Sequence, residues 1–185
     1  MRTAIYSGSF NPLHIGHLAI MKHMTEDAGF DCVYLIVSPK NPLKEGISSA
    51  TGPERYRSAV EAVARHPELK VKVDDIELTM EEPHYTIRTL DALREREPEN
   101  AFTLVIGADN LASIRRWRDY SRILAEYGVA VFPRTGFDLE QIKADLIQEN
   151  PEFKITLLKA EMVDISSTTI REALASGQDT SAWLM

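Results

Sequence analysis

The sequence predicts an α/β domain in which an open, mostly parallel β-sheet carries helices on both faces. Three observations support this class. Short apolar stretches recur along the 185 residues, helical patterns stand between them, and the length suits one domain with a sizeable core. Strands that alternate with helices form βαβ units, and such units build parallel sheets that are covered on both sides.

Six stretches have the composition of strands. They are rich in Val, Ile, Leu, Phe and Tyr, and Gly or Pro bounds several of them. In chain order they are RTAIYSG (2–8), CVYLIVS (32–38), VKVDDIEL (71–78), FTLVIGA (102–108), GVAVFPR (128–134) and FKITLLKAEMV (153–163). No internal repeat, low-complexity tract or linker divides the sequence, so we expect a single domain over residues 1–185.

Apolar residues at helical spacing predict the connecting helices, because residues three or four positions apart share one face of a helix. This pattern covers residues 18–28, 53–65, 86–97 and 168–177, and a weaker form of it covers 109–126 and 138–149. Pro53 suits a first helical turn, Pro98 stops the third helix, and Gly177 ends the last one.

Composition and charge exclude several classes of protein. The net charge is −7 at pH 7, so the surface as a whole attracts neither nucleic acid nor an anionic membrane, and any phosphate must bind in a local basic pocket. The longest aliphatic runs have about five residues, which is too short for a membrane span or a signal peptide. Cys32 is the single cysteine, so no intrachain disulfide can form. We therefore expect a cytoplasmic protein in a reducing compartment.

The least regular stretch is PKNPLKEGISSATGP, residues 39–53, which is polar and follows a predicted strand. Open α/β sheets bind ligands at the carboxyl ends of their strands. We interpret this stretch as a mobile active-site loop, with an ordinary surface loop as the alternative.

Residues 7–17, SGSFNPLHIGH, join a predicted strand to a helix through a glycine-containing turn. A helix start offers amide N–H groups and a positive dipole end to phosphates. The stretch matches neither the dinucleotide fingerprint nor the P-loop. His14 and His17 are three positions apart and share one helix face, so both imidazoles could reach one anion. The alternatives are half of a metal site, surface or capping residues, or buried hydrogen-bonded residues.

A second polar motif, DISSTTIRE, covers residues 164–172 at the start of the last helix. Its four consecutive hydroxyl residues suit a helix cap, and Thr169 with Glu172 fits a capping box. Arg171 falls in the first turn, where a cation opposes the helix dipole by roughly 0.3–1 kcal/mol. A bound phosphate would resolve that conflict, whereas a solvent-facing arginine is the alternative.

Two motifs at opposite ends of the chain resemble those of a known family. Residues 8–17, GSFNPLHIGH, are similar to the G-x-F-D-P-x-H-x-G-H motif of the nucleotidyltransferase superfamily, and residues 165–171, ISSTTIR, resemble its I-S-S-T-x-I-R motif. Between them, PHYTIRTL (83–90) and IGADNLASIRRW (106–117) look like segments of bacterial nicotinate-nucleotide adenylyltransferases. Ser7, Ser9 and Asn11 stand where members of this family commonly have glycine, threonine and aspartate.

The resemblance implies a Rossmann-like fold and a reaction. ATP, accompanied by Mg²⁺ as cofactor, would give its adenylyl group to nicotinate mononucleotide, with nicotinate adenine dinucleotide and pyrophosphate as products. The sequence shows no carboxylate-rich cage, so we expect no dedicated metal site on the protein, and assembly into a homo-oligomer stays open. Two other readings stay open: an adenylyltransferase acting on nicotinamide mononucleotide, and a catalytically silent nucleotide-binding module.

The resemblance also assigns residues. It makes His14 and His17 the catalytic pair, which would donate hydrogen bonds to the reacting phosphates. It implies that ATP is bound by Gly8, Ser9, Phe10, Gly16, Gly107, Asp109, Ile165, Ser166, Ser167 and Arg171. It implies that the pyridine mononucleotide is bound by Asn11, Lys44, Tyr85, Thr86 and Trp117. For Lys44 the alternative is a solvated lysine, and for Trp117 it is a partly exposed ring on a basic face.

Overall fold

A computed structural model describes residues 1–39, 51–160 and 166–185. Within these ranges the strands form one six-stranded sheet in the order β3-β2-β1-β4-β5-β6, and each neighbouring pair is parallel. The strands are β1 (Arg2–Gly8), β2 (Cys32–Val37), β3 (Val71–Asp74), β4 (Ala101–Gly107), β5 (Val129–Phe132) and β6 (Ile155–Leu157). The predicted open parallel sheet is confirmed.

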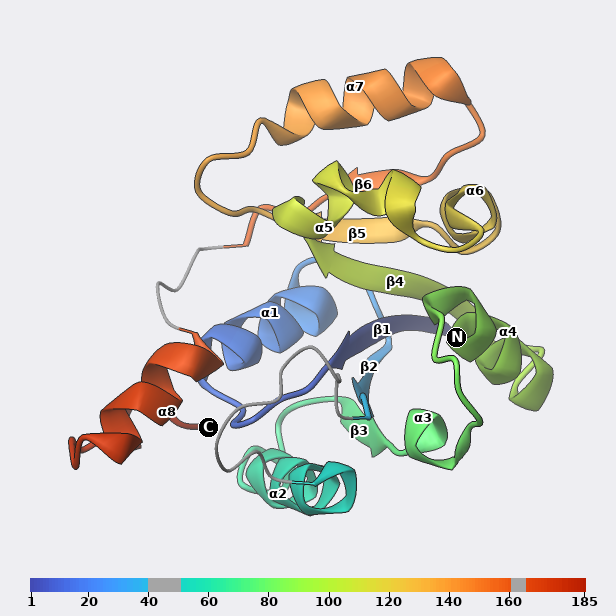
Figure 1. The fold of residues 1–185 in the computed structure, drawn as a ribbon. Helices are drawn as coiled ribbons and strands as arrows, with labels where there is room; N and C mark the ends of the chain where they lie inside the picture. Colours follow the sequence, from blue (N-terminus) through green and yellow to red (C-terminus); the bar gives the residue numbers. More distant parts are fainter. Residues whose placement is uncertain (40–50, 161–165) are drawn as a thin grey trace.

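Helices cover both faces of the sheet, as Figure 1 shows for α1 and α4, which lie on opposite sides of β1. The helices are α1 (Ile15–Glu26), α2 (Gly52–Ala64), α3 (Ile76–Thr79), α4 (Thr86–Arg96), α5 (Ala108–Ala112), α6 (Tyr120–Arg122), α7 (Leu139–Glu149) and α8 (Ser167–Ala175). Short 3₁₀ turns occupy Ile114–Arg116 and Ser181–Trp183, and one π-helical turn covers Ile123–Tyr127. Within the described ranges, no helix combines the length and the hydrophobicity that a membrane crossing requires.

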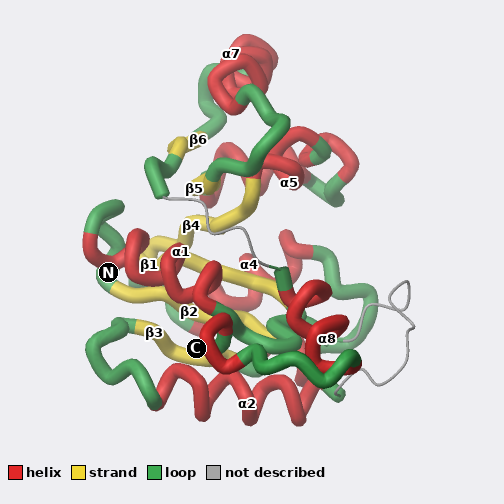
Figure 2. Tube along the Cα trace, turned by 90° about the vertical axis from the view of Figure 1, so that its left-hand side faces the viewer, coloured by secondary structure: helices red, strands yellow, loops and turns green. Residues whose placement is uncertain are grey.

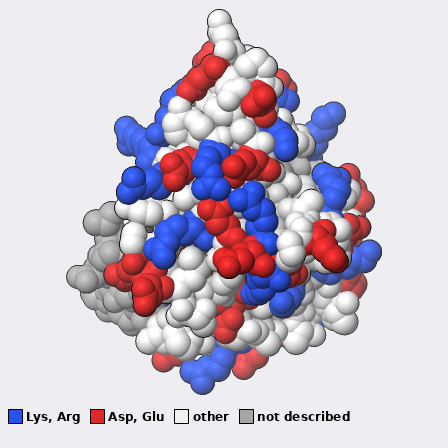
Figure 3. All heavy atoms as spheres, turned by 90° about the vertical axis from the view of Figure 1, so that its right-hand side faces the viewer, with Lys and Arg blue, Asp and Glu red and all other residues white. Residues whose placement is uncertain are grey.

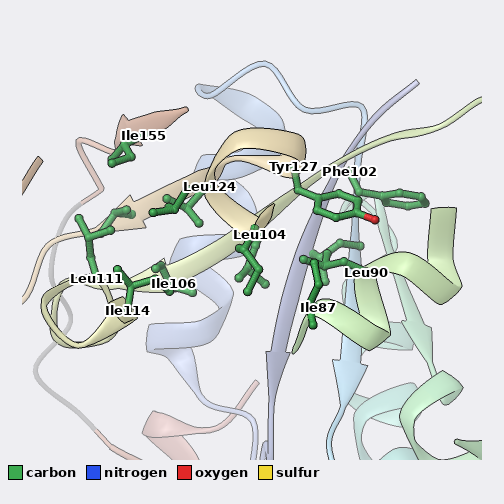
Figure 4. Close-up of a cluster of buried hydrophobic side chains, with 14 of the residues drawn as sticks. Ile87, Leu90, Phe102, Leu104, Ile106, Leu111, Ile114, Leu124, Tyr127 and Ile155 are labelled. Carbon is green, nitrogen blue, oxygen red and sulfur yellow. The ribbon is translucent and has the colours of Figure 1, made fainter. Parts of the chain in front are cut away.

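Two apolar clusters hold the layers together, one on each face of the sheet. Side chains alternate between the faces along each strand, so neighbouring residues of β1 enter different clusters. Ile5 joins the cluster that contains Leu90 of α4 and Leu104 of β4 (Figure 4), whereas Tyr6 joins the cluster that contains Met21 of α1. The strands are therefore buried on both faces, which is typical of a parallel sheet with helices on each side.

The strand order reverses at β1, which lies between β2 and β4. In open α/β sheets such a reversal leaves a crevice at the carboxyl ends of the two diverging strands, and ligands bind there. Tyr6 of β1 is paired with Val105 of β4. Because this register is parallel, Gly8 and Gly107 reach the same edge of the sheet two residues later. The crevice thus lies where the sequence motifs after β1 and β4 begin.

Two predicted strands, at 71–78 and 153–163, are much longer than the observed ones. The predicted strand at 71–78 ends at Asp74 because the Asp74 carboxylate accepts the Ile76 amide at 3.0 Å and turns the chain into α3. The same carboxylate is almost fully buried and takes a salt bridge from Arg96 at 2.6 Å. The strand at 153–163 is also shorter than expected, since β6 covers only Ile155–Leu157, and residues 161–165 lie outside the described ranges.

The weakly predicted helix at 109–126 is a series of short turns rather than one helix. Asp119 adopts a left-handed backbone conformation with φ of +52°, and this breaks the helical path between the 3₁₀ turn and α6. Most of the expected loop at 39–53 lies outside the described residues, and α2 begins at Gly52 after a Thr51 cap. That expectation therefore stays a prediction.

The face of the molecule that carries α4 and α6 mixes both signs of charge, as Figure 3 shows. Arg122 pairs with Asp91 at 3.0 Å and with Glu126 at 2.8 Å, and Arg94 extends the same network. Charges that neutralise one another at this range leave little field to attract a polyanion. The described residues on this face therefore form no extended basic surface for a polyanion, as expected from the acidic net charge.

Candidate active site

The two histidines of the opening motif build the first turn of α1 by capping it. His14 is the N-cap residue, and its Nδ1 atom accepts the amide of Gly16 at 3.1 Å. His17 reaches back, and its Nδ1 atom accepts the amide of His14 at 3.1 Å. This is the reciprocal geometry of a capping box, in which imidazoles replace the usual hydroxyl and carboxylate. Capping, an alternative considered from the sequence, is therefore observed, and it fixes both rings.

This capping also decides which ring nitrogen carries the proton. A nitrogen that accepts an amide N–H must present a lone pair, so the proton of each neutral ring is on Nε2. The two rings stack with their centroids 3.7 Å apart. Two stacked rings, each with an Nε2–H donor, therefore lie where α1 begins.

Burial keeps both rings neutral. Desolvation, with a smaller contribution from the Arg134 charge, lowers the pKa of His14 to about 4. Desolvation again leads for His17, and His14 and Arg134 add to it, so the pKa of His17 is lowered to about 3. Near pH 7 the pair consists of uncharged hydrogen-bond donors, and the positive charge of the site comes from neighbouring arginines.

The turn before the histidines is shaped by Phe10. Phe10 has a φ of +47° and is buried, and its ring packs edge-on against His17 with centroids 5.1 Å apart. A Cβ atom on Gly8 would lie 3.1 Å from the Phe10 ring. Gly8 therefore makes room for Phe10, a role that its expected closeness to phosphate did not reveal.

Arg55 of α2 forms hydrogen bonds to the same turn. Its guanidinium donates to the carbonyl oxygens of Ser9 at 2.8 Å and Ser38 at 2.7 Å. Its side chain is buried, and burial lowers the pKa of the guanidinium. Arg55 thereby links the ends of β1 and β2. The sequence reasoning missed it, because an arginine beside the apolar stripe of a helix carries no local signal of this contact.

Arg134 is the second site residue that the sequence reasoning missed. It follows β5, and its Nε atom lies 3.1 Å from the Asp109 carboxylate at the start of α5. A Cβ atom on Gly107 would lie 2.7 Å from Asp109 and 2.8 Å from Arg134, so only glycine admits this pair. The positive charge of Arg134 also contributes to lowering the pKa of both histidines. A cation at the end of the predicted strand GVAVFPR, two residues after the buried run VAVF, was the available signal.

The start of α8 lies against the histidine turn. Arg171 donates one hydrogen bond to the Asn11 carbonyl and another to the Thr168 hydroxyl at 3.2 Å. Ser166 caps α8 by accepting the Thr169 amide at 3.1 Å. Ser166 is thus the one of the four expected hydroxyl residues that caps the helix, whereas the capping box expected at Thr169 and Glu172 is wrong because Thr169 lies inside the helix. Lys44 and Ile165 lie outside the described residues, and so does the side chain of Ser167.

Two of the expected acceptor residues, Tyr85 and Thr86, lie at the start of α4. Tyr85 is the N-cap residue, and its side chain does not cap the helix, so the first amides of α4 keep their N–H groups for another acceptor. The guanidinium carbon of Arg118 lies 5.0 Å from the centroid of the Tyr85 ring. Trp117 is partly buried against the apolar cluster of α4 and β4. Among the described residues, no hydrogen bond or ring contact joins Tyr85, Thr86 or Trp117 to the histidine pair.

A metal cage is not built from the part of the chain that the structure describes. In residues 1–39, 51–160 and 166–185, no three His, Cys, Asp or Glu side chains gather closely enough to hold an ion. The Asp109 carboxylate at the start of α5 is paired with Arg134.

Comparison with known proteins agrees with this architecture. The sequence profile of the family described as "Cytidylyltransferase-like" matches residues 5–173. A solved structure of Plasmodium falciparum nicotinic acid mononucleotide adenylyltransferase complexed with NaAD superposes with a TM-score of 0.78 at 20% identity, and the match covers 96% of this chain and 86% of that one. At such low identity this likeness shows the fold alone.

Closer relatives are found among bacterial sequences. A protein of Flavobacterium johnsoniae named "Probable nicotinate-nucleotide adenylyltransferase" is 36% identical over 179 residues, which span 97% of this chain and 89% of the relative. A protein of the same name from Bacteroides fragilis is 39% identical over 178 residues, spanning 96% and 84%. The chain belongs to the cytidylyltransferase-like family, among the bacterial nicotinate-nucleotide adenylyltransferases.

Proposed function

We propose that this chain transfers the adenylyl group of ATP to nicotinate mononucleotide, yielding nicotinate adenine dinucleotide and pyrophosphate. The observation that carries the proposal is the pair of stacked, neutral imidazoles at the start of α1, in which Nδ1 of each ring accepts a backbone amide and Nε2 carries the proton. The names of the bacterial relatives supply the acceptor, and the product named in the Plasmodium complex agrees with it.

The chemistry asks for alignment rather than for a base. A phosphate oxygen of the mononucleotide attacks the α-phosphorus of ATP, and the bond from that phosphorus to the oxygen bridging toward the β-phosphate breaks. The electron pair leaves with pyrophosphate. The attacking phosphate is already anionic near pH 7, so no proton has to be removed first, and catalysis consists of positioning and charge stabilisation.

The histidine pair suits that task because its donors are fixed. Each Nδ1 atom is held by a backbone amide, so each Nε2–H points along a direction set by the helix start. Donors that are already oriented need no reorganisation as charge develops on the phosphate oxygens. Arg134 and Arg171 supply positive charge on either side of this pair, one after β5 and one in α8.

The acceptor pocket suits a carboxylate. The first turn of α4 has no acidic side chain, and its leading amides have no side-chain cap. The positive end of the helix dipole therefore favours the nicotinate carboxylate over the neutral amide of nicotinamide. The Arg118 guanidinium over Tyr85 adds a cation beside this turn.

Mg²⁺ would enter with ATP. The described residues provide no carboxylate cage, which fits an ion that keeps most of its waters and is held mainly by substrate phosphates. When bound, the ion would neutralise charge on the phosphates of ATP and of the leaving pyrophosphate.

The proposal is tested by mixing the protein with ATP, Mg²⁺ and nicotinate mononucleotide and measuring pyrophosphate and dinucleotide by chromatography. We expect both products in equal amounts, and neither product when the mononucleotide is left out. Binding of ATP without any product would support the silent nucleotide-binding module instead.

A further inference from the structure

The last residues of the chain return to the catalytic histidine. Leu184 pairs with His14 in an isolated antiparallel β-bridge, so the backbone of the N-cap residue of α1 is covered by a segment far away in sequence. Figure 2 shows the chain end lying between α1 and α2, and Figure 1, viewed at 90° to it, shows the same placement beside α8.

This segment is anchored on both sides of the bridge. The Met185 side chain is 7% exposed and belongs to the same buried cluster as Phe10 and Leu13, which flank the histidine turn. Before the bridge, Thr180 is buried, and its backbone carbonyl accepts the Trp183 amide at 2.9 Å. A bridge of one residue pair is weak by itself, so these anchors are what keep it in register.

Arg65, at the end of α2, binds the backbone of Met185. Its Nε and Nη2 atoms donate to the backbone oxygen of Met185 at 3.3 and 2.8 Å. Arg65 follows α2 directly as its C-cap residue, so the position of its guanidinium is set by a helix that packs on the sheet. A path of direct contacts therefore runs from Arg65 through Met185 and Leu184 to His14.

We propose that Arg65 and residues 184–185 are a positioning element that holds the His14 backbone, and with it the imidazole, in the orientation that adenylyl transfer requires. The inference rests on the proposed function for its kinetic consequence, and its structural content stands without it. The observed contacts lead from these three residues to the His14 backbone, so in this proposal they act through His14. Loss of the element should misplace a transition-state donor without removing a substrate contact.

The kinetic test uses a double-mutant cycle. We expect Arg65→Ala, and deletion of Leu184 and Met185, each to lower kcat on the order of tenfold while the KM values for ATP and for the mononucleotide change little. In a His14→Ala background the same changes should have no further effect, because they act through the missing ring. Arg57→Ala, an exposed arginine on the same helix, is the matched control and should behave as wild type.

A second readout does not depend on activity. The His14 ring faces His17 on its own helix and Arg134 after β5, and its titration can be followed by NMR of the imidazole protons. Release of the tail should raise the pKa of His14 toward the ordinary value near 6.5, whereas Arg57→Ala should leave it low.

An equal kcat loss in the presence and absence of His14 would overturn the proposal, because the changes would then act on the whole fold. Unchanged kcat together with an unchanged His14 titration would overturn it as well. If the wild-type protein formed no dinucleotide at all, the proposed function would fall, while the titration would still decide whether this element positions His14.

Discussion

His14 and His17 stabilise the start of their helix through Nδ1, and under the proposed function the same rings would donate Nε2–H to the reacting phosphates. The i and i+3 spacing was visible in the sequence. The roles of the two ring nitrogens were not, because they depend on backbone amides that approach only when the turn has folded.

Replacing either histidine by alanine should remove one oriented donor. We expect His14→Ala and His17→Ala each to lower kcat by about 10²–10³-fold, the usual effect of losing a preorganised donor to developing charge. Steady-state kinetics measures the loss, and circular dichroism checks that the fold persists. Near-normal turnover in both variants would contradict the assignment.

The low pKa values of the pair also link stability to pH. The folded state holds both rings neutral, since their pKa values are about 4 and 3, whereas in the unfolded chain an ordinary histidine titrates near 6.5. The unfolded state therefore takes up protons first as pH falls. The stabilisation is complete above about pH 6.5 and is lost progressively below it, at about 1.4 kcal/mol per pH unit for each ring.

Urea unfolding between pH 5 and pH 6 measures this slope in a window above the carboxyl titrations. His17→Ala should reduce the slope by the share of one proton, relative to the wild-type protein. A free energy of unfolding with the same pH slope in the variant would mean that His17 is not held neutral by the fold.

The charge of Arg134 lowers the pKa of both imidazoles, and Arg134 forms a salt bridge with Asp109. We expect Arg134→Ala to weaken a non-hydrolysable ATP analogue on the order of 10- to 100-fold, because hydrogen bonds to charged groups contribute roughly 1.5–3 kcal/mol. Arg134→Lys keeps the charge and should lose less. Calorimetry compares the three proteins, and equal affinity in all of them would remove Arg134 from the site.

At the scale of elements, what the sequence predicts depends on whether the deciding contacts are local. The apolar runs before residues 8 and 107 predicted β1 and β4 closely, since continuous burial leaves a strong pattern. The strand at 71–78 was overextended because a buried ion pair between Asp74 and Arg96 ends it, and no local pattern announces a partner 22 residues away.

Arg55 and Arg134 could not be identified from the sequence because their partners are also distant in sequence. Arg55 and Arg134 act through carbonyl and carboxylate partners on other elements, 46 and 25 residues away in sequence for Ser9 and Asp109. The sequence offered four consecutive hydroxyl residues as caps of α8 and could not choose among them, so the capping box expected at Thr169 was misplaced while Ser166 caps the helix. The motifs themselves needed no such partner to be recognised.

The start of α4 carries the element-scale prediction. Arg118→Gln should reduce discrimination between the acid and the amide mononucleotide by roughly three- to fivefold, because an exposed charge contributes up to about 1 kcal/mol. Arg116→Gln, a neighbouring exposed arginine, is the matched control and should leave the ratio of kcat/KM values unchanged. The same loss in both variants would indicate a general field effect rather than a pocket residue.

For the whole molecule, the sheet order matters most, because it brings distant motifs to one crevice. The turn after β1 carries the histidines, the segment after β5 carries Arg134, and α8 brings Arg171 from the far end of the chain. The parallel arrangement followed from the alternation of strands and helices. The docking of the last residues against His14 did not, since a single bridge and one arginine contact leave no periodic pattern.

The most direct test of the whole account offers the protein both acceptors at once. ATP and Mg²⁺ are mixed with equal concentrations of nicotinate and nicotinamide mononucleotide, and the two dinucleotide products are separated by chromatography at low conversion. The account predicts nicotinate adenine dinucleotide in about 10- to 100-fold excess, the discrimination expected when helix amides bind a charged rather than a neutral group. Equal amounts of the two products, or an excess of the nicotinamide product, would contradict it.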